Sequence, residues 1–270
     1  MELTTKSILP LLFLLSLTAC DDDSGAPSDS YATNEIYPNI TAVESQDGEV
    51  ITTVVLEPDP NTGEMLYLNG GDRFYTSLGT PPDQLISFGE DLFTNAQALS
   101  TRLKIMEKNG TSEYSSIDTT AGLAPPVRAY VAFERGYGKW TGQTWVELPP
   151  AFTLLNPAPN SSLSRTFNDP ITLSWTDIDN TATMQLESQM VCLDTRYPIV
   201  TINLGIDTGT AQVSAADYFP PGAPINWDCR ASFTLKRIGP TRFISSELGL
   251  GSLNTFQGIQ QRTVEFTSAP

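Results

Sequence analysis

Apolar and polar residues alternate in short runs along most of the chain, and few residues repeat at the helical spacing of three to four. The runs at 49–57, 73–79 and 127–135 are rich in β-branched and aromatic residues and end near glycine or proline. In the third run, every second residue from Val127 to Phe133 is apolar. A period of two places these side chains on one face of a strand. The pattern therefore predicts an all-β protein.

Turn signals divide these runs. Asn109-Gly110 lies between two strand-like runs, which predicts a hairpin. The stretch Thr-Gly-Gln-Thr at 141–144 predicts a second turn. The segment 148–170 is dense in proline and polar turn residues. Such a segment is typical of a domain boundary, which we therefore expect near residue 150.

Beyond this boundary, the run at 171–179 places Ile171, Leu173 and Trp175 on one side of a strand. A strand with tryptophan near its end, after a proline-bearing turn, resembles the second strand of a fibronectin type III or related immunoglobulin-like sandwich. More strand-like runs follow at suitable spacing, and the resemblance covers residues 152–268. It departs from true immunoglobulin domains because Trp175 precedes both of the later cysteines instead of lying between them.

The start of the chain carries a short polar segment with Lys6 and then the apolar run ILPLLFLLSL, which is typical of a signal peptide and too short for a membrane span. The tetrapeptide Leu-Thr-Ala-Cys at 17–20 resembles the lipobox of bacterial lipoproteins. The resemblance implies cleavage before Cys20 and lipidation of its thiol. An ordinary secretory leader with an incidental cysteine is the alternative.

These patterns together predict an all-β chain with two β-sandwich modules. The expected parts are a signal peptide at 1–19, a flexible acidic tether at 20–45, a sandwich-like domain at 46–150 and an immunoglobulin or fibronectin III-like domain at 151–270.

The formal net charge is −16, and its distribution is uneven. Residues 20–72 hold twelve acidic residues and no basic residue. A self-repelling, solvated spacer explains this run. The charge excludes nucleic acid as an expected partner. A basic cluster of Arg230, Lys236, Arg237 and Arg242 is predicted to be a solvated strand edge.

The chain has three cysteines, an odd number that needs an explanation in an exported protein. If Cys20 is lipidated, Cys192 and Cys229 remain as an even pair, which an oxidising compartment favours as a disulfide. Two free buried thiols are the alternative.

The chain has no histidine, which removes Ser-His-Asp and Cys-His mechanisms and most zinc or copper sites. Carboxylates such as Glu90 and Asp91 leave a hydrolase as a remote alternative. The rings of Tyr137, Trp140 and Trp145 form a candidate ligand surface, with core packing as the competing interpretation.

The sequence thus predicts a non-enzymatic binding or scaffold protein without cofactor or metal. Its expected partners are the membrane, through lipid on Cys20, and an envelope protein or glycan. A carbohydrate-binding module is the main alternative. We expect a periplasm-facing location, in the inner membrane if Asp21 acts as a retention signal and otherwise in the outer membrane.

Overall fold

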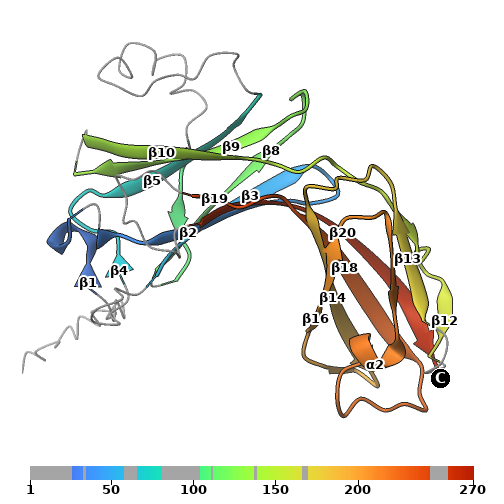
Figure 1. Ribbon diagram of the computed structural model, residues 1–270. Helices are drawn as coiled ribbons and strands as arrows, with labels where there is room; N and C mark the ends of the chain where they lie inside the picture. The colour runs from blue at the N-terminus through green and yellow to red at the C-terminus, as the bar shows by residue number, and fades with distance from the viewer. Residues whose placement is uncertain are drawn as a thin grey trace, which may run out of the picture.

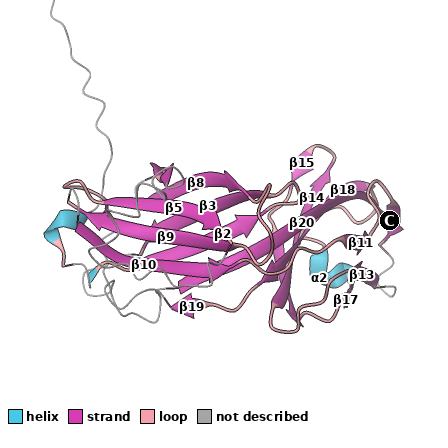
Figure 2. Cartoon of the chain, turned by 90° about the horizontal axis from the view of Figure 1, so that it is seen from above, coloured by secondary structure: helices cyan, strands magenta, loops and turns pink. Residues whose placement is uncertain are grey.

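The computed structural model describes most of the chain after the first 25 residues. The described ranges are 26–32, 35–57, 66–80, 104–110, 112–136, 139–165, 170–243 and 255–270. The predicted signal peptide, Cys20, Asp21, Glu90, Asp91 and Tyr137 lie outside them. Strands dominate these ranges, as the alternating pattern predicted (Figure 2).

The first sandwich consists of two facing layers. One layer is the meander β2 (Pro38–Glu44), β3 (Glu49–Leu56), β8 (Glu113–Thr119) and β7 (Glu107–Lys108). The other has the order β10 (Lys139–Glu147), β9 (Arg128–Arg135), β5 (Arg73–Gly79) and β6 (Lys104–Ile105). Ile40 and Val54 from the first layer and Phe74 and Phe133 from the second are fully or almost fully buried in the shared core. The short strands β1 (Ala26–Pro27) and β4 (Leu66–Tyr67) pair in parallel beside this core. The single-turn helix η1 (Ser28–Ser30) follows β1 in the chain.

The second sandwich also consists of two facing sheets. One sheet is β11 (Leu154–Asn156), β13 (Ile171–Trp175) and β17 (Thr210–Val213). The facing sheet runs β16 (Val200–Ile206), β14 (Thr183–Cys192), β18 (Cys229–Ile238) and β20 (Thr255–Ala269). The remaining elements are β12 (Ser162–Ser164) and β19 (Arg242–Phe243) along β20, β15 (Thr195–Arg196) along β14, and the single-turn helix α2 (Ala215–Tyr218). The predicted all-β fold of two sandwiches is confirmed, with Trp175 at the end of β13 in the second core.

The two sandwiches share one continuous sheet, because the long strand β20 belongs to both (Figure 1). Residues 256–260 of this strand pair in parallel with β2, from Ile40–Phe256 to Glu44–Gln260, while most of its length pairs antiparallel with β18. Phe256 is buried in the first core and Phe266 in the second. A strand that contributes to both cores leaves no flexible linker between them at this point.

Two local predictions have a clear outcome. Asn109-Gly110 does form the hairpin between β7 and β8, with a positive φ of 116° at Gly110. The turn expected at 141–144 is wrong, because these residues continue β10 and the register shifts there as in a β-bulge. The chain instead reverses after β9, where Gly136 has a positive φ of 39°.

The flexible tether predicted over 20–45 is also wrong for its last part. Pro38–Glu44 forms β2, and Ile40 and Ala42 are fully buried in the first core. The polar composition of this segment concealed the alternation, since the inward residues Ile40 and Ala42 are flanked by the buried but polar or turn-forming Pro38 and Glu44. Pairing with β3 on one side and β20 on the other keeps the strand in the sheet.

Cys192 and Cys229 form a disulfide between neighbouring strands of one sheet. They are directly opposite residues of β14 and β18, with a Cα–Cα distance of 4.4 Å. Both are almost completely buried. The bond therefore fastens β14 to β18 at the end of the second sandwich that is farther from the first.

Candidate functional site: the joint between the sandwiches

Three segments meet where the two sandwiches join. They are the middle of β20, the turn between β2 and β3, and the chain that leads from β10 to β11. Gly258 allows β20 to lie close to the end of β10, because a Cβ at this position would lie 2.7 Å from the Glu147 carbonyl oxygen. The absence of a side chain thus lets β20 pass directly beneath the end of β10.

A buried ion pair holds the chain leading from β10 to β11 against the second sandwich. Arg237 Nη2 lies 2.8 Å from Asp207 Oδ2, and both side chains are fully buried. Arg237 also donates hydrogen bonds to the Pro150 carbonyl at 2.7 Å and to the Thr176 carbonyl at 3.1 Å. These further hydrogen bonds offset part of the cost of burying the pair. The Arg237 Nε has no hydrogen-bond partner among the described residues. The predicted solvated basic edge is therefore wrong for Arg237, which is an internal anchor.

The carboxylate of Asp207 joins both sheets of the second sandwich. It accepts hydrogen bonds from the Trp175 indole at 2.7 Å, the Asp179 amide at 3.0 Å and the Gly209 amide at 3.1 Å. Burial alone would raise the pKa of Asp207. The three hydrogen bonds and the Arg237 charge outweigh burial, so the pKa lies below its ordinary value and the group stays ionised.

Phe152 lies between two arginines at the joint. The Arg237 and Arg262 guanidinium carbons are 4.7 Å and 5.2 Å from the centroid of its ring. Arg262 Nε donates to the Phe152 carbonyl at 2.8 Å, and its Nη1 donates to the Gln261 carbonyl at 2.7 Å. Burial lowers the pKa of the Arg262 guanidinium, which nevertheless remains a cation at neutral pH. These cation–π contacts fix the ring and the chain that carries it.

A second polar cluster ties β2 to β20 on the side of the first sandwich. Gln260 donates its amide to Glu44, and Thr120 donates its hydroxyl to the other oxygen of Glu44 at 3.1 Å. Glu44 and Gln260 are both buried. With the ion pair on the other side of the joint, this cluster indicates a rigid connection rather than a hinge.

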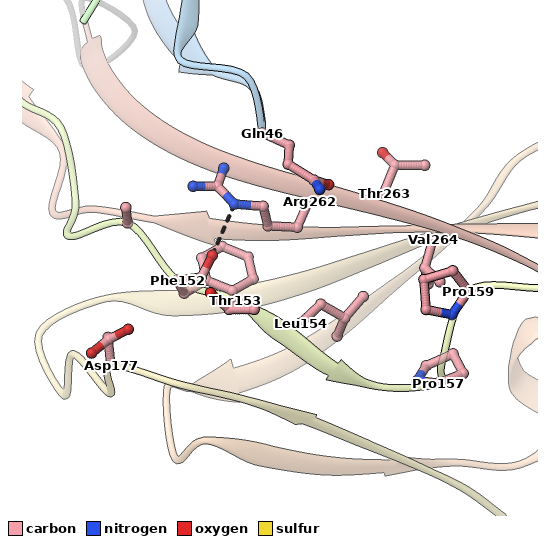
Figure 3. Close-up of a pocket in the computed structure, with 11 residues that line it drawn as sticks. Gln46, Phe152, Thr153, Leu154, Pro157, Pro159, Asp177, Arg262, Thr263 and Val264 are labelled. Carbon is pink, nitrogen blue, oxygen red and sulfur yellow. Dashed lines mark hydrogen bonds between the residues drawn. The ribbon is translucent and has the colours of Figure 1, made fainter. Parts of the chain in front are cut away.

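A groove of about 320 Å³ opens at this joint (Figure 3). Gln46 reaches from the β2–β3 turn toward Arg262 at one end, and Pro157 and Pro159 lie at the other end near Val264. Its full lining is Gln46, Ala151, Phe152, Thr153, Leu154, Pro157, Pro159, Asp177, Arg262, Thr263 and Val264. Both apolar and polar side chains line the groove, which lies between two modules, a usual place for a binding site.

The groove holds few ionisable groups. Its ionisable groups within the described part of the chain are one guanidinium, on Arg262, and one carboxylate, on Asp177. A cluster of three or more potential metal ligands does not occur among the described residues. No helix in the ranges given above is long and apolar enough to cross a membrane.

The predicted aromatic surface is only partly visible. Tyr137 lies outside the described residues, and Trp140 lies in β10 with its side chain undescribed. Trp145 is half-buried, directly opposite Tyr130 on β9. The Arg128 guanidinium lies over its ring at 3.8 Å. One face of the Trp145 ring is therefore already in contact with a side chain, and Trp145 belongs to neither sandwich core.

Comparison with known proteins adds little to this geometry. No protein-family model matches the chain, and no curated protein matches it. Among solved structures, it is similar to a chimeric titin Z1Z2 functionalized with a KLER exogenous peptide from decorin. That match is 7% identical with a TM-score of 0.21 and covers 89% of this chain and 100% of the other. The fold assignment accordingly rests on the strand order.

Sequence reasoning missed the groove. The prolines that line it lie in the segment 148–170, which the sequence predicts to be a domain boundary. The sequence therefore pointed to this region but did not predict a binding site there. Arg262 and Thr263 lie in the closing strand, where alternation predicts one inward and one outward side chain. Bringing them to Gln46 requires the parallel pairing of β2 with β20, which no local pattern announces.

Proposed function

We propose that the chain is a lipid-anchored, periplasm-facing protein of the cell envelope that acts by binding and not by catalysis. The observation that carries this proposal is the groove between two rigidly joined sandwiches, lined by both apolar and polar side chains. A chain without histidine offers few routes to general acid–base or nucleophilic catalysis.

The rigid joint supports a binding role on energetic grounds. A site that is already formed loses little conformational entropy when its ligand arrives. Here the Arg237–Asp207 pair and the Glu44–Gln260 contact hold both walls of the groove before any ligand is present. A partner would thus meet a fixed surface.

The anchor is proposed from the lipobox-like tetrapeptide at 17–20 and the acidic segment after it. Two or three acyl chains on Cys20 would hold the protein at a membrane, whereas one chain holds only weakly. The choice between inner and outer membrane depends on whether Asp21 is read as a retention signal.

The proposal is tested by photo-cross-linking in the cells that make the protein. A photoreactive residue is placed in turn at Gln46 in the groove, at Ile117 on the outer sheet face and at Trp227 near the disulfide; all three side chains are exposed. We expect a discrete cross-linked partner from at least one position. The absence of a specific partner from all three would contradict a binding role.

A further inference from the structure

Two strands, β2 and β12, pair with the same edge of β20, and a gap at the groove separates them. β2 pairs with residues 256–260 of β20 and β12 pairs with residues 267–269, both in parallel. β18 occupies the opposite side of β20 over residues 259–268, so β2 and β12 share the other side. Residues 261–266 between them span about 20 Å of strand.

The backbone of Thr263 faces this gap. The Gly258 carbonyl accepts from the Gly239 amide on the β18 side, whereas the Glu265 carbonyl accepts from the Asn160 amide at 2.8 Å on the other side. The β18–β20 register is continuous, so odd-numbered residues of β20 direct their N–H and C=O away from β18. Within the described residues, the N–H and C=O of Thr263 have no hydrogen-bond partner.

The neighbouring groups limit the length of the free edge. The Gln261 carbonyl already accepts from Arg262, and the Glu265 carbonyl from Asn160. The free edge is therefore short and centred on Thr263, whose side chain is exposed. Beside it the groove presents Leu154 and Val264 at the border of the second core.

We propose that an extended segment of a partner polypeptide adds as a strand beside Thr263, in the line of β2 and β12. Its backbone pairs with the Thr263 N–H and C=O, and alternate side chains enter the groove against Leu154 and Val264. The net charge of −16 favours a neutral or basic segment.

This inference rests on the proposed binding function and names its site and ligand class. Strand addition requires a donor and an acceptor on one exposed edge, which Thr263 supplies. A glycan has no such regular backbone pairing, and its binding here would be a different proposal.

The test uses peptides selected from a random nine-residue display library against the full chain. The blocking variant is Gln46→Trp, which fills the groove from an exposed turn and leaves both cores untouched. The matched control is Glu49→Trp, an exposed position of β3 that does not line the groove. We expect selected peptides with alternating apolar residues whose affinity falls at least tenfold in Gln46→Trp and stays within twofold in Glu49→Trp.

A second pair of variants examines the backbone itself. Thr263→Pro removes the outward N–H, and proline is tolerated where a strand N–H faces an open edge. Thr263→Val keeps that N–H and loses only the hydroxyl contact with Thr234 at 3.0 Å. We expect at least tenfold weaker peptide binding for Thr263→Pro alone. If that variant does not fold, slower exchange of the Thr263 amide on peptide binding to the unsubstituted chain tests the same point.

Several results would overturn the inference. These are equal peptide affinity in Gln46→Trp and Glu49→Trp, unchanged exchange of the Thr263 amide, glycan fragments binding in the groove, or a dimer of the chain that Gln46→Trp dissociates. If cross-links in cells form only from Ile117 or Trp227, the proposed binding function stands and this inference fails.

Discussion

Arg237 and Asp207 lie 2.8 Å apart with both side chains fully buried, and together they connect the chain leading into the second sandwich to both of its sheets. Arg237 is on β18 and bonds the Pro150 carbonyl, while Asp207 accepts from Trp175 on the facing sheet. The pair therefore organises the joint beside the groove.

Replacing Arg237 by methionine should destabilise the protein strongly. The substitution leaves the Asp207 carboxylate buried without its cation, a change that costs about 3–5 kcal/mol. Urea unfolding followed by tryptophan fluorescence measures the change. The control is Lys236→Met, which breaks the part-exposed pair with Glu187 and should cost less than about 1 kcal/mol. Similar losses in both variants would contradict the role of Arg237.

Stability should fall in acid because of Asp207. Its pKa is lowered in the folded protein, from an ordinary value of 3.8. A group whose pKa is depressed on folding stabilises the protein above its unfolded pKa, and this contribution is lost as the pH falls through the folded value. The free energy of unfolding should therefore decrease progressively below about pH 4.

Asp207→Asn provides the control for this pH dependence. The variant should be less stable at neutral pH and should lose less stability than the unsubstituted chain between neutral pH and acid. Parallel pH curves for the two proteins would show that other carboxylates cause the acid sensitivity.

Gly258→Ala should destabilise the joint by about 1–3 kcal/mol. The new Cβ would lie 2.7 Å from the Glu147 carbonyl and 3.3 Å from Leu148 Cα, which are backbone atoms with little room to move. Gly79→Ala is the matched control, because its Cβ would meet only the Tyr130 ring at 3.6 Å. Thermal unfolding compares the two, and equal midpoints would contradict the close contact between β20 and β10.

Removing the disulfide should lower the stability by about 4 kcal/mol in the chain-entropy model. Cys192 and Cys229 are separated by 37 residues, which sets the size of the loop that the bond closes. The double variant Cys192→Ala with Cys229→Ala should have the same free energy of unfolding as the unsubstituted chain that has been unfolded, reduced and refolded. A double variant as stable as the oxidised chain would mean that the bond restricts neither the folded nor the unfolded chain.

The sequence was informative wherever one face of a strand is buried and the other solvated. The alternation at 127–135 identified β9, the alternation at 171–175 identified β13 with Trp175, and the Asn109-Gly110 pair identified a hairpin. Counting cysteines favoured the disulfide over two free thiols, and the structure confirms the bond.

The sequence failed where tertiary pairing decides the outcome. β2 was assigned to the tether because its polar outward residues resemble linker composition, although its inward residues are buried. The first half of β20 was missed because Gly258 and neighbouring glutamines weaken the strand pattern. Arg237 was predicted to be solvated because no local pattern reveals a buried anion on another strand. The groove depends on both missed strands, so it could not be predicted.

Intact mass of the membrane-extracted chain, with and without reduction, tests the anchored-protein proposal most directly. The proposal predicts a chain that begins at Cys20 and carries acyl mass, with a gain of about two daltons on reduction of the Cys192–Cys229 bond. A chain that begins elsewhere without acyl mass would contradict the anchor and the membrane location.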